Sequence, residues 1–301
     1  MAPTGAPLET VFHIDTLAVV GVGLIGGSVA AALRRHAAVG TVLGVGRHPQ
    51  SIERARRLGL IDTPATLEEA AALADVILLA TPVAATEAIL TQLAAYLRPR
   101  TLVTDVGSTK ANVVAAARTA LGARASQFVA AHPIAGTERT GPDAADAGLF
   151  DGRVVVLTPG READAAMRDT LTRLWERCGA RVVVMAPEAH DRALASVSHL
   201  PHFLAAAFMA QVAGAPDADR RLGLAGTGFR DFTRIAAGSP EVWRDIFLAN
   251  RAAVLAELEA FRTELGGFAR ALENGDGQEL FNFLERAAVA RRFWAGRSGL
   301  S

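Results

Sequence analysis

The chain has 301 residues, half of them hydrophobic and 21% charged, and its 31 basic residues are balanced by 31 acidic ones. This length predicts about two domains with enough apolar side chains for sizeable cores. The zero net charge gives no electrostatic reason to expect a nucleic acid or an anionic membrane as a partner. The single cysteine, Cys178, excludes an internal disulfide framework and a cysteine-rich zinc cluster.

The sequence predicts a soluble, cytoplasmic protein. Charged residues interrupt its apolar stretches well before the roughly 20 residues that a membrane span needs. Near the N-terminus stand Glu9, His13 and Asp15, where a signal peptide would have a basic region and then an apolar run. Thirty of the basic residues are arginine, a bias typical of genomic base composition, and only Lys110 is lysine. Lys110 is therefore singled out as a position that favours a compact ammonium.

The first half of the chain alternates strand-like runs with helical patterns, which predicts βαβ units and a parallel sheet. We expect helices over about residues 24–35, 51–58 and 162–178. The expected strands span residues 17–20, 41–45, 75–80, 102–105, 128–131, 153–157 and 181–184. This part of the chain is therefore predicted to be an α/β domain.

After Pro187 the character of the sequence changes to long helical patterns, over residues 190–213, 242–265 and 277–294, with no convincing strand. We therefore expect one domain at residues 12–187 and an all-α domain at residues 188–301. The second domain is rich in Leu, Phe and Ala and has too little polar surface to cover them. It is expected to bury one face in a homodimer, although all-α cores of monomers have a similar composition.

Gly21, Gly23 and Gly26 form the strongest local motif, with Leu24 and Ile25 between the last two glycines. The first glycine permits a tight turn, the second lets the backbone approach a pyrophosphate, and the third allows close packing of helix on strand. A strand-like run precedes the motif and a helix follows it, as the dinucleotide fingerprint requires. We therefore expect a Rossmann-like dinucleotide site here rather than a structural glycine turn.

The end of the second strand indicates which dinucleotide binds. NAD enzymes usually have Asp or Glu there, about 20 residues past the glycines, to bind the ribose 2′-hydroxyl. This chain has Gly46 and Arg47 instead, so no carboxylate is available and a guanidinium can meet a 2′-phosphate. We expect NADP as the cofactor, with NAD as the alternative, in which case Arg47 is an ordinary exposed arginine.

Polar residues follow two further strands at the edge where ligands bind in such sheets. Thr81 and Pro82 end the third strand, and Asp105 and Ser108 follow the fourth. We expect all four residues to line the cofactor site, with Ser108 also bonding the substrate. The alternative role for Ser108 is to cap the helix that follows it.

Four of the seven histidines, His132, His190, His199 and His202, fall in segments that can meet at this edge. A lone histidine is usually structural, but four that can meet at one edge point to a shared site. No carboxylate cluster with metal-ligand spacing accompanies them. An acid–base or hydrogen-bonding role is therefore favoured over a metal site.

Arg230 and Arg234 lie one helical turn apart if their segment is helical, so that they share a face. Two guanidinium groups on one face can clamp a dicarboxylate through bidentate hydrogen bonds. The alternative is a solvated pair, or a bridge to Asp231 or Asp245 within the protein.

Five segments taken together resemble the prephenate/arogenate (cyclohexadienyl) dehydrogenase family of tyrosine biosynthesis. They are residues 21–26, 105–110, 132–138, 198–202 and 228–234, which follow the family's order over about residues 15–250. The resemblance implies a Rossmann-like nucleotide-binding domain, an all-α dimerisation domain and an active site in the cleft between them.

The resemblance also implies roles for single residues: His132 as the catalytic histidine, Ser108 as the hydrogen-bonding serine and Arg234 as the arginine for a substrate carboxylate. The other implied pocket positions are Thr137, Glu138, His190, His199, His202, Arg230 and Trp243.

The implied reaction is the oxidative decarboxylation of prephenate, arogenate or both, small molecules that carry a 4-hydroxyl and a ring carboxylate. His132 takes the hydroxyl proton while hydride passes to NADP, and the loss of CO₂ leaves an aromatic ring, so no metal is required. One alternative is another β-hydroxyacid dehydrogenase, such as the 3-hydroxyisobutyrate type, which uses a lysine on a C-terminal-domain helix. Lys110 lies in the first domain, which argues against it. The other alternative is a non-catalytic NADP-binding sensor, which needs neither the histidines nor the arginine pair.

Overall fold

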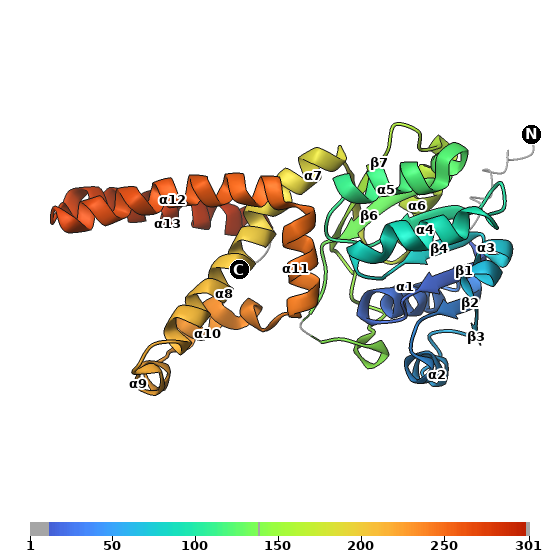
Figure 1. The fold of residues 1–301 in the computed structure, drawn as a ribbon, viewed down its shortest axis with the longest axis horizontal. Coiled ribbons are helices and arrows are strands. Elements are labelled where there is room, and N and C mark those ends of the chain that lie inside the picture. The colour runs from blue at the N-terminus through green and yellow to red at the C-terminus, as the bar shows by residue number, and fades with distance from the viewer. Residues whose placement is uncertain (1–11, 138, 299–301) are drawn as a thin grey trace, which may run out of the picture. The chain divides into compact units, whose positions relative to one another are not determined.

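The computed structural model describes residues 12–137 and 139–298, which form two compact units divided between Arg251 and Ala252 (Figure 1). The larger unit contains a sheet and all the helices that precede Asn250. The smaller unit consists of two long helices, α12 (Arg251–Glu273) and α13 (Gly277–Ser298). The helices between Pro187 and Asn250 therefore pack with the sheet, although composition alone groups them with the C-terminal helices.

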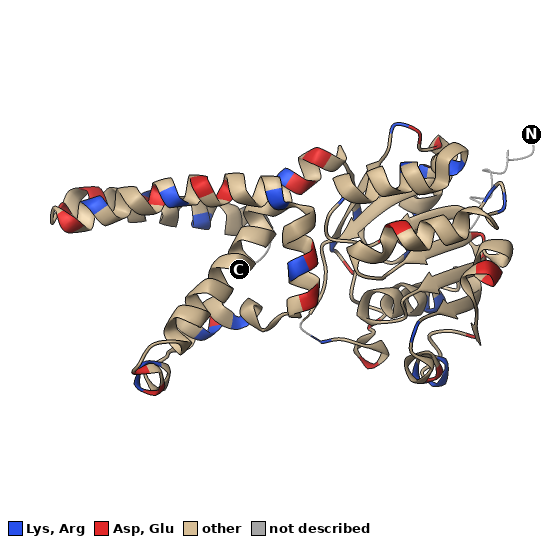
Figure 2. Ribbon diagram, viewed as in Figure 1, with Lys and Arg blue, Asp and Glu red and all other residues tan. Residues whose placement is uncertain are grey.

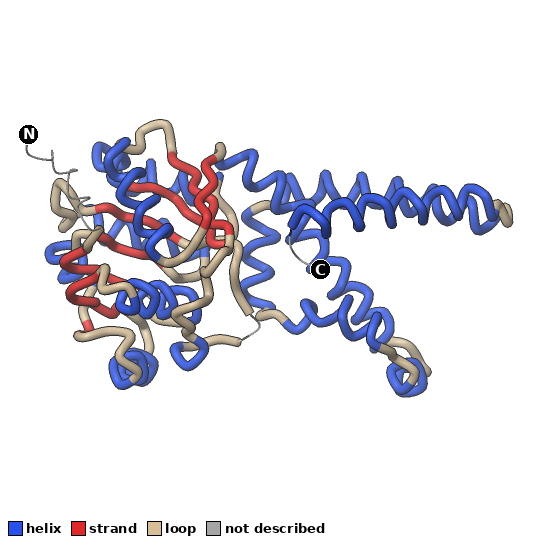
Figure 3. The backbone as a smooth tube through the Cα atoms, turned by 180° about the vertical axis from the view of Figure 1, so that it is seen from behind, coloured by secondary structure: helices blue, strands red, loops and turns tan. Residues whose placement is uncertain are grey.

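The sheet has eight strands in the order β3-β2-β1-β4-β5-β6-β7-β8. Figure 3 draws its strands in red, with helices around them in blue. The seven expected strands are all present, and the structure adds the two-residue β3 at one edge. The Rossmann-like fold predicted for the first part of the chain is thereby confirmed. The strands are β1 (Ile14–Val20), β2 (Val39–Val45), β3 (Thr63–Pro64), β4 (Val76–Leu79), β5 (Leu102–Asp105), β6 (Phe128–Pro133), β7 (Val154–Pro159) and β8 (Arg181–Val184).

Two strands depart from the expected parallel arrangement, since β7 runs antiparallel to β6 and β8 runs parallel to β7. A parallel neighbour needs a crossover connection, usually a helix, whereas the β6–β7 connection has no α-helix in its described residues. Two contacts hold that connection beside α1 (Leu24–Arg35) and α2 (Pro49–Arg57). The N–H of Asp146 donates to Ser28 Oγ at 2.9 Å, and Arg54 Nε donates to Asp143 Oδ1 at 2.9 Å.

The strands bury both faces, because alternate side chains point to opposite sides of a sheet. Leu17 and Val19 of β1 belong to one apolar core with residues of α1, α2 and α6 (Ala165–Arg177). Ala18 and Val20 belong to a second core with α3 (Leu67–Leu73), α4 (Thr86–Ala94) and α5 (Ala111–Leu121). The sheet therefore lies between two layers of helices, and its carboxyl edge is left to the connections between strands and helices.

The helices after β8 differ from the expected pattern in two places. They are α7 (Pro187–Leu194), a π-helical turn η4 (Ala195–His199), α8 (Leu200–Ala213), α9 (Ala218–Gly223), α10 (Thr227–Thr233), a 3₁₀ turn η5 (Arg234–Ala237) and α11 (Pro240–Ala249). The short helices α9 and α10 were not predicted, because glycines interrupt their periodicity. The helix expected over residues 242–265 is also broken, at Asn250, whose side-chain amide binds α7 and η4 instead.

Two contacts within the larger unit bring these helices to the carboxyl edge of the sheet. Helix α7 packs against α5, and α11 packs against the 3₁₀ turn η1 (Val83–Ala85) that follows β4. Residues far apart in the sequence therefore meet where parallel strands end, which is where ligands bind in sheets of this type.

The helical run Pro187–Ala213 is, by length and composition, apolar enough to cross a membrane, with a mean hydropathy of 1.3. The expectation that charges interrupt every apolar stretch early is therefore too strict for this run, and Figure 2 shows that α8 carries no charged residue. Its first part, however, holds His190, Asp191 and His199, which are buried in hydrogen bonds with other segments of the larger unit. These contacts fix the first part of the run within the larger unit, whereas α8 itself buries only Leu200 and Ala205.

Candidate active site

The β1–α1 turn has the shape that its glycines predict. Gly21 has φ +95°, and a Cβ there would lie 2.4 Å from the carbonyl oxygen of Ala80. A Cβ on Gly26 would lie 2.4 Å from the carbonyl oxygen of Gly21, so this glycine lets α1 pack closely on β1. A Cβ on Gly23 would meet nothing within 4 Å. Only Gly23 therefore faces open space, on the side where a pyrophosphate would approach.

The N-terminus of α1 is also suited to an anion. Gly23 is the N-cap and offers no side chain to the free N–H groups of the first turn, which includes the half-buried Leu24 and Ile25. Such N–H groups bind phosphate readily. Thr81 lies beside Gly21, and its buried hydroxyl has no hydrogen-bond partner within the described residues. Together with Pro82 it follows β4 directly, next to the turn. A nicotinamide dinucleotide fits this cradle.

Arg47 lies exposed just beyond β2, and among residues 12–137 and 139–298 it makes no hydrogen bond or ion pair. Gly46 precedes it, and a Cβ on Gly46 would lie 2.8 Å from Ile52 Cδ1. A carboxylate therefore could not stand at position 46 unless Ile52 moved. The guanidinium of Arg47 is left available to an anionic group.

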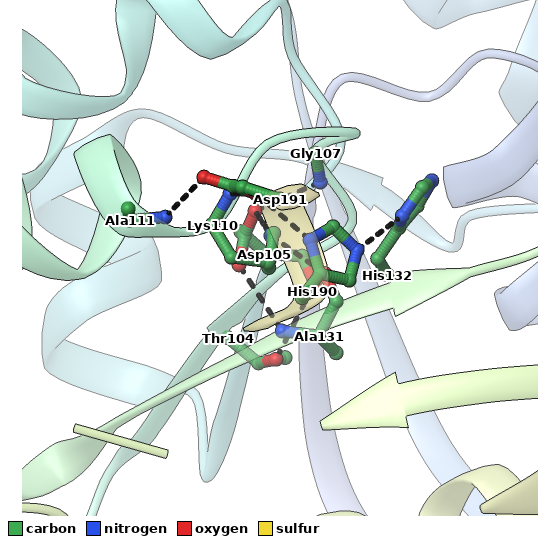
Figure 4. A network of polar contacts seen from close by, with 9 residues as sticks. All are labelled: Thr104, Asp105, Gly107, Lys110, Ala111, Ala131, His132, His190 and Asp191. Carbon is green, nitrogen blue, oxygen red and sulfur yellow. Dashed lines mark hydrogen bonds and ion pairs between the residues drawn. The ribbon is translucent and has the colours of Figure 1, made fainter. Parts of the chain in front are cut away.

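Lys110 joins the ends of β5 and β6 in a buried network (Figure 4). Its ammonium donates to Asp105 Oδ2 at 2.5 Å and to the carbonyl oxygen of Ala131 at 2.8 Å, and its side chain is fully buried. Asp105 also accepts hydrogen bonds from the N–H groups of Gly107 and Ala131. The Asp105 carboxylate is thus occupied within the protein, which gives it a structural part beside the cofactor-binding role expected from the sequence.

Helix α5 receives its N-terminal cap from a distant carboxylate. Lys110 is the N-cap residue, and its own side chain does not cap the helix. Asp191 of α7 accepts instead, from the N–H of Lys110 at 2.8 Å and from the N–H of Ala111 at 2.9 Å. Ser108 makes no hydrogen bond within the described residues, and it is half-buried. The structure therefore does not give Ser108 the capping role, and its hydroxyl is left available.

His132, at the end of β6, is bonded to the same carboxylate through a second histidine. His132 Nδ1 lies 2.9 Å from His190 Nε2, and His190 Nδ1 lies 2.8 Å from Asp191 Oδ1. All three residues are buried. The chain of three side chains runs from the sheet edge to the N-terminus of α5, as Figure 4 shows.

His132 is held as a neutral base. Burial lowers its pKa well below the ordinary value of 6.5, and the nearby Lys110, His190 and His199 lower it further. A neutral imidazole has one nitrogen with a free lone pair. Nδ1 is bonded to His190, and in the tautomer that carries its hydrogen on Nδ1 the other nitrogen, Nε2, can accept a proton from a ligand.

A second polar group extends from this network towards α11. Asn250 Nδ2 donates to the carbonyl oxygen of Asp191 at 2.7 Å and lies 3.1 Å from His199 Nδ1. Burial lowers the pKa of His199 to about 4, so it is neutral at physiological pH. The rings of His199 and Trp243 make an edge contact, with their centroids 6.2 Å apart.

The ring of His202 stacks on the ring of Trp243, and the two ring centroids are 3.6 Å apart. Burial lowers the pKa of His202, the hydrogen bond to the carbonyl oxygen of Ser198 raises it, and the charge of Arg234 lowers it. Helix α8, which carries His202, packs against η5, which begins at Arg234. Arg234 is exposed at the start of η5. His132, His190, His199, His202, Trp243 and Arg234 are thus linked in one connected arrangement.

Two expected positions, Arg230 and Thr137, are not joined to this arrangement by any hydrogen bond or ion pair among the described residues. Arg230 is exposed, and its guanidinium is 3.7 Å from the carboxylate of its neighbour Asp231. Thr137 is exposed, and its hydroxyl accepts a hydrogen bond from the N–H of Arg139. Glu138 lies outside the described residues.

Sequence reasoning missed two residues of the network. Asp191 follows His190 directly, but an acidic residue in the first turns of a helix is an ordinary feature. Asn250 lies inside the helical pattern expected over residues 242–265, and the sequence carries no signal for the break that the structure has there. Among residues 12–137 and 139–298, no group of three His, Cys, Asp or Glu side chains is arranged to hold a metal ion.

Comparison with known proteins assigns a family to both parts of the chain. Residues 29–184 match the family model described as "Prephenate dehydrogenase, nucleotide-binding domain", and residues 186–286 match "Prephenate dehydrogenase, dimerization domain".

Individual proteins agree with this assignment. The chain is 36% identical to a prephenate dehydrogenase of Bacillus subtilis over 91% of its length and 74% of the relative's. It is 34% identical to a cyclohexadienyl dehydrogenase of Zymomonas mobilis, over 91% and 94% of the two chains. The crystal structure of prephenate dehydrogenase from Aquifex aeolicus in complex with hydroxyphenyl propionate and NAD⁺ is similar with a TM-score of 0.88 and 34% identity. That match covers 94% of this chain and 99% of the other.

The last two glycines of the motif, Gly23 and Gly26, give a matched test of the cofactor cradle. Gly26→Ala should lower the melting temperature, because its Cβ meets the Gly21 backbone and overpacking costs about 1–3 kcal/mol. Gly23→Ala should leave the melting temperature unchanged but weaken dinucleotide binding about tenfold or more, because its Cβ occupies the open side of the turn. Thermal unfolding and calorimetric titration measure both effects. Unchanged binding by Gly23→Ala would show that the turn is only structural.

Proposed function

The chain belongs to the prephenate dehydrogenase family, and from this premise we propose that it oxidises prephenate, arogenate or both with NADP as the preferred acceptor. The observation that carries this proposal is His132, a buried neutral base at the carboxyl edge of the sheet, oriented by His190 and Asp191. A non-catalytic sensor has no use for such a base. The lysine-dependent alternative is not favoured either, because the ammonium of Lys110 is bound to Asp105 and is fully buried.

We assign proton transfer to His132. When bound, the nicotinamide dinucleotide supplies the hydride acceptor. His132 Nε2 takes the proton of the substrate 4-hydroxyl, and Ser108, whose hydroxyl has no hydrogen-bond partner within the described residues, orients that group. The hydroxyl carbon loses its hydrogen as hydride and becomes a carbonyl. The ring carboxylate then leaves as CO₂, its bonding electrons shift through the ring onto the carbonyl oxygen, and that oxygen takes a proton back from His132 to give the phenol. Aromatisation makes the step effectively irreversible, and none of these steps requires a metal.

We assign substrate carboxylates to the arrangement of His202, Trp243 and Arg234. Arg234 supplies a positive charge close to the stacked pair of His202 and Trp243. A guanidinium can bond a carboxylate at two points, which fixes the orientation of the substrate. His199 contacts the edge of the Trp243 ring and is fully buried, so we propose that it holds Trp243 in place. Arg230, Thr137 and Glu138 remain expected pocket residues on the family's pattern.

The preference for NADP rests on Arg47. This guanidinium has no partner within the described residues, and it lies beyond β2, where the adenosine ribose binds in such folds. A 2′-phosphate would provide a charge-assisted hydrogen bond, whereas the 2′-hydroxyl of NAD would meet no carboxylate. Prephenate and arogenate differ at the side chain, as keto and amino acid, and a kinetic comparison of both substrates with both cofactors separates the four combinations.

We propose that the active form is a homodimer. The matched dimerization model covers residues 186–286, which include most of the α12–α13 pair. Both helices expose large apolar side chains, and a single copy leaves these in water at a cost that association removes. The exposed residues are Leu255, Leu265, Leu272, Phe281, Leu284, Val289, Phe293 and Trp294.

The His132→Asn variant tests the proton acceptor. It should lower kcat by about 10²–10⁴-fold with little change in KM, the usual worth of general acid–base catalysis. In the unmodified enzyme kcat/KM should fall only at a pH below the ordinary histidine value of 6.5, because the pKa of His132 is lowered. The exposed His13, at the opposite end of the sheet, gives the control His13→Asn, which should keep full activity. Near-native turnover by His132→Asn would remove this residue from the mechanism.

The Arg234→Gln variant tests substrate binding. The loss of a charge-assisted hydrogen bond, about 1.5–3 kcal/mol, should raise KM about 10–100-fold while kcat changes less. Arg220→Gln, on the exposed helix α9, is the matched control and should leave KM unchanged. If KM for Arg234→Gln stays the same and only the melting temperature falls, the arginine is structural.

The Arg47→Gln variant tests cofactor choice. It should lower kcat/KM with NADP about 10–100-fold, the value of one hydrogen bond to a charged group, and leave kcat/KM with NAD unchanged. Arg100→Gln, before β5 at the amino edge of the sheet, is the control and should affect neither cofactor. The Arg47 assignment fails if the unmodified enzyme uses both cofactors equally well.

A further inference from the structure

His132 is one end of a buried chain of hydrogen bonds whose other end is the backbone of α5. The links are His132 Nδ1 to His190 Nε2 at 2.9 Å, His190 Nδ1 to Asp191 Oδ1 at 2.8 Å, and Asp191 to the N–H groups of Lys110 and Ala111. We propose that His190 and Asp191 are positioning residues, which fix the proton of His132 on Nδ1 and stabilise the charge that His132 gains. The proposal rests on His132 being the proton acceptor.

The direction of each hydrogen bond follows from Asp191. Burial raises the pKa of this carboxyl, but the bonds from His190 and from the N–H groups of Ala111 and Lys110 outweigh it, so the pKa is lowered and the group is ionised. An ionised carboxylate only accepts, so His190 Nδ1 must carry a hydrogen. The Nε2 of a neutral His190 then accepts, and His132 Nδ1 must donate to it. This leaves the lone pair of His132 on Nε2.

The charges around His132 make Asp191 the group that favours its protonation. Lys110, from the β5–α5 connection, and the rings of His190 and His199 all oppose a positive charge on His132. The negative charge of Asp105 is directly paired with the Lys110 ammonium. The carboxylate of Asp191 is joined to His132 through one imidazole, so a positive charge on the two rings lies against a fixed negative charge.

The same carboxylate holds the segment that contains Ser108. Asp191 binds the N–H groups of Lys110 and Ala111, two and three residues after Ser108. The carbonyl oxygen of Asp191 is in turn bonded by Asn250 at the end of α11. One side chain therefore orients both the proton acceptor and the hydroxyl assigned to the substrate, through two different branches.

We call the chain of side chains His132–His190–Asp191 the relay. The Asp191→Asn variant tests the negative charge at its end. It should lower kcat about 10–100-fold, less than His132→Asn, as is usual for residues that orient a catalytic group. The acid limb of log(kcat/KM) should move to lower pH, because His132 is harder to protonate without the negative charge. Asp75→Asn is the matched control, since Asp75 also accepts a backbone hydrogen bond, from the N–H of Thr16, but precedes β4 at the amino edge. Both variants should lose thermal stability, and only Asp191→Asn should shift the pH profile.

A pair of variants at His190 keeps Asp191 bound to α5 and tests the tautomer. His190→Gln retains an oxygen that can accept from His132 Nδ1, so it should keep a larger part of kcat than His190→Leu, which offers no acceptor. KM should be similar for both. This comparison tests whether His132 Nδ1 donates to residue 190 even if Asp191→Asn fails to fold.

Two results would overturn the relay: an unshifted pH profile in Asp191→Asn, or equal kcat in His190→Gln and His190→Leu. If His132→Asn is nevertheless inactive, the assignment of His132 as base stands without the relay. If His132→Asn is fully active, the base itself is wrong, and both proposals fall together.

Discussion

The carboxylate of Asp191 is the point on which the candidate site depends. It replaces the N-terminal cap that α5 lacks and also bonds His190, so one buried group satisfies a helix end and the histidine that contacts His132. A buried donor left without its acceptor costs about 1–3 kcal/mol, and Asp191 satisfies two backbone N–H groups and one imidazole. Helix α7 is held against α5 by this interaction, and it carries His190 with it.

A second buried charge, the ammonium of Lys110, stabilises the connection between β5 and α5. The ammonium of Lys110 neutralises Asp105 and binds the backbone next to His132, while the N–H of Lys110 binds Asp191. The loss of one partner from a buried ion pair costs about 3–5 kcal/mol, because the other charge is left uncompensated. Arginine could not replace Lys110 in this fully enclosed space, since its planar fork needs room for five N–H donors. The single lysine in a chain of thirty arginines is thereby explained.

Local patterns in the sequence were sufficient for most of the fold. The strand-like runs, the glycine turn at Gly21 and the positions of Ser108 and His132 after strands all follow from periodicity and from the geometry of parallel sheets. The reversed direction of β7 and β8 was not predicted, because it depends on the connection that precedes β7 and on its contacts with Ser28 and Arg54. Asp191 was missed for the same reason: its function comes from amides about 80 positions earlier, and such a pairing has no local signature.

The enclosure of Lys110 has a consequence for how motions of this site can be followed. In the folded chain its ammonium is inaccessible to reagents that acylate amines, and no other side chain of the protein is an amine. Acylation of this position requires the β5–α5 connection to separate from β6, which is a local unfolding event. Mass spectrometry of the peptide that contains Lys110 would give the rate of labelling. This rate would therefore report how often the site opens spontaneously, without any engineered probe.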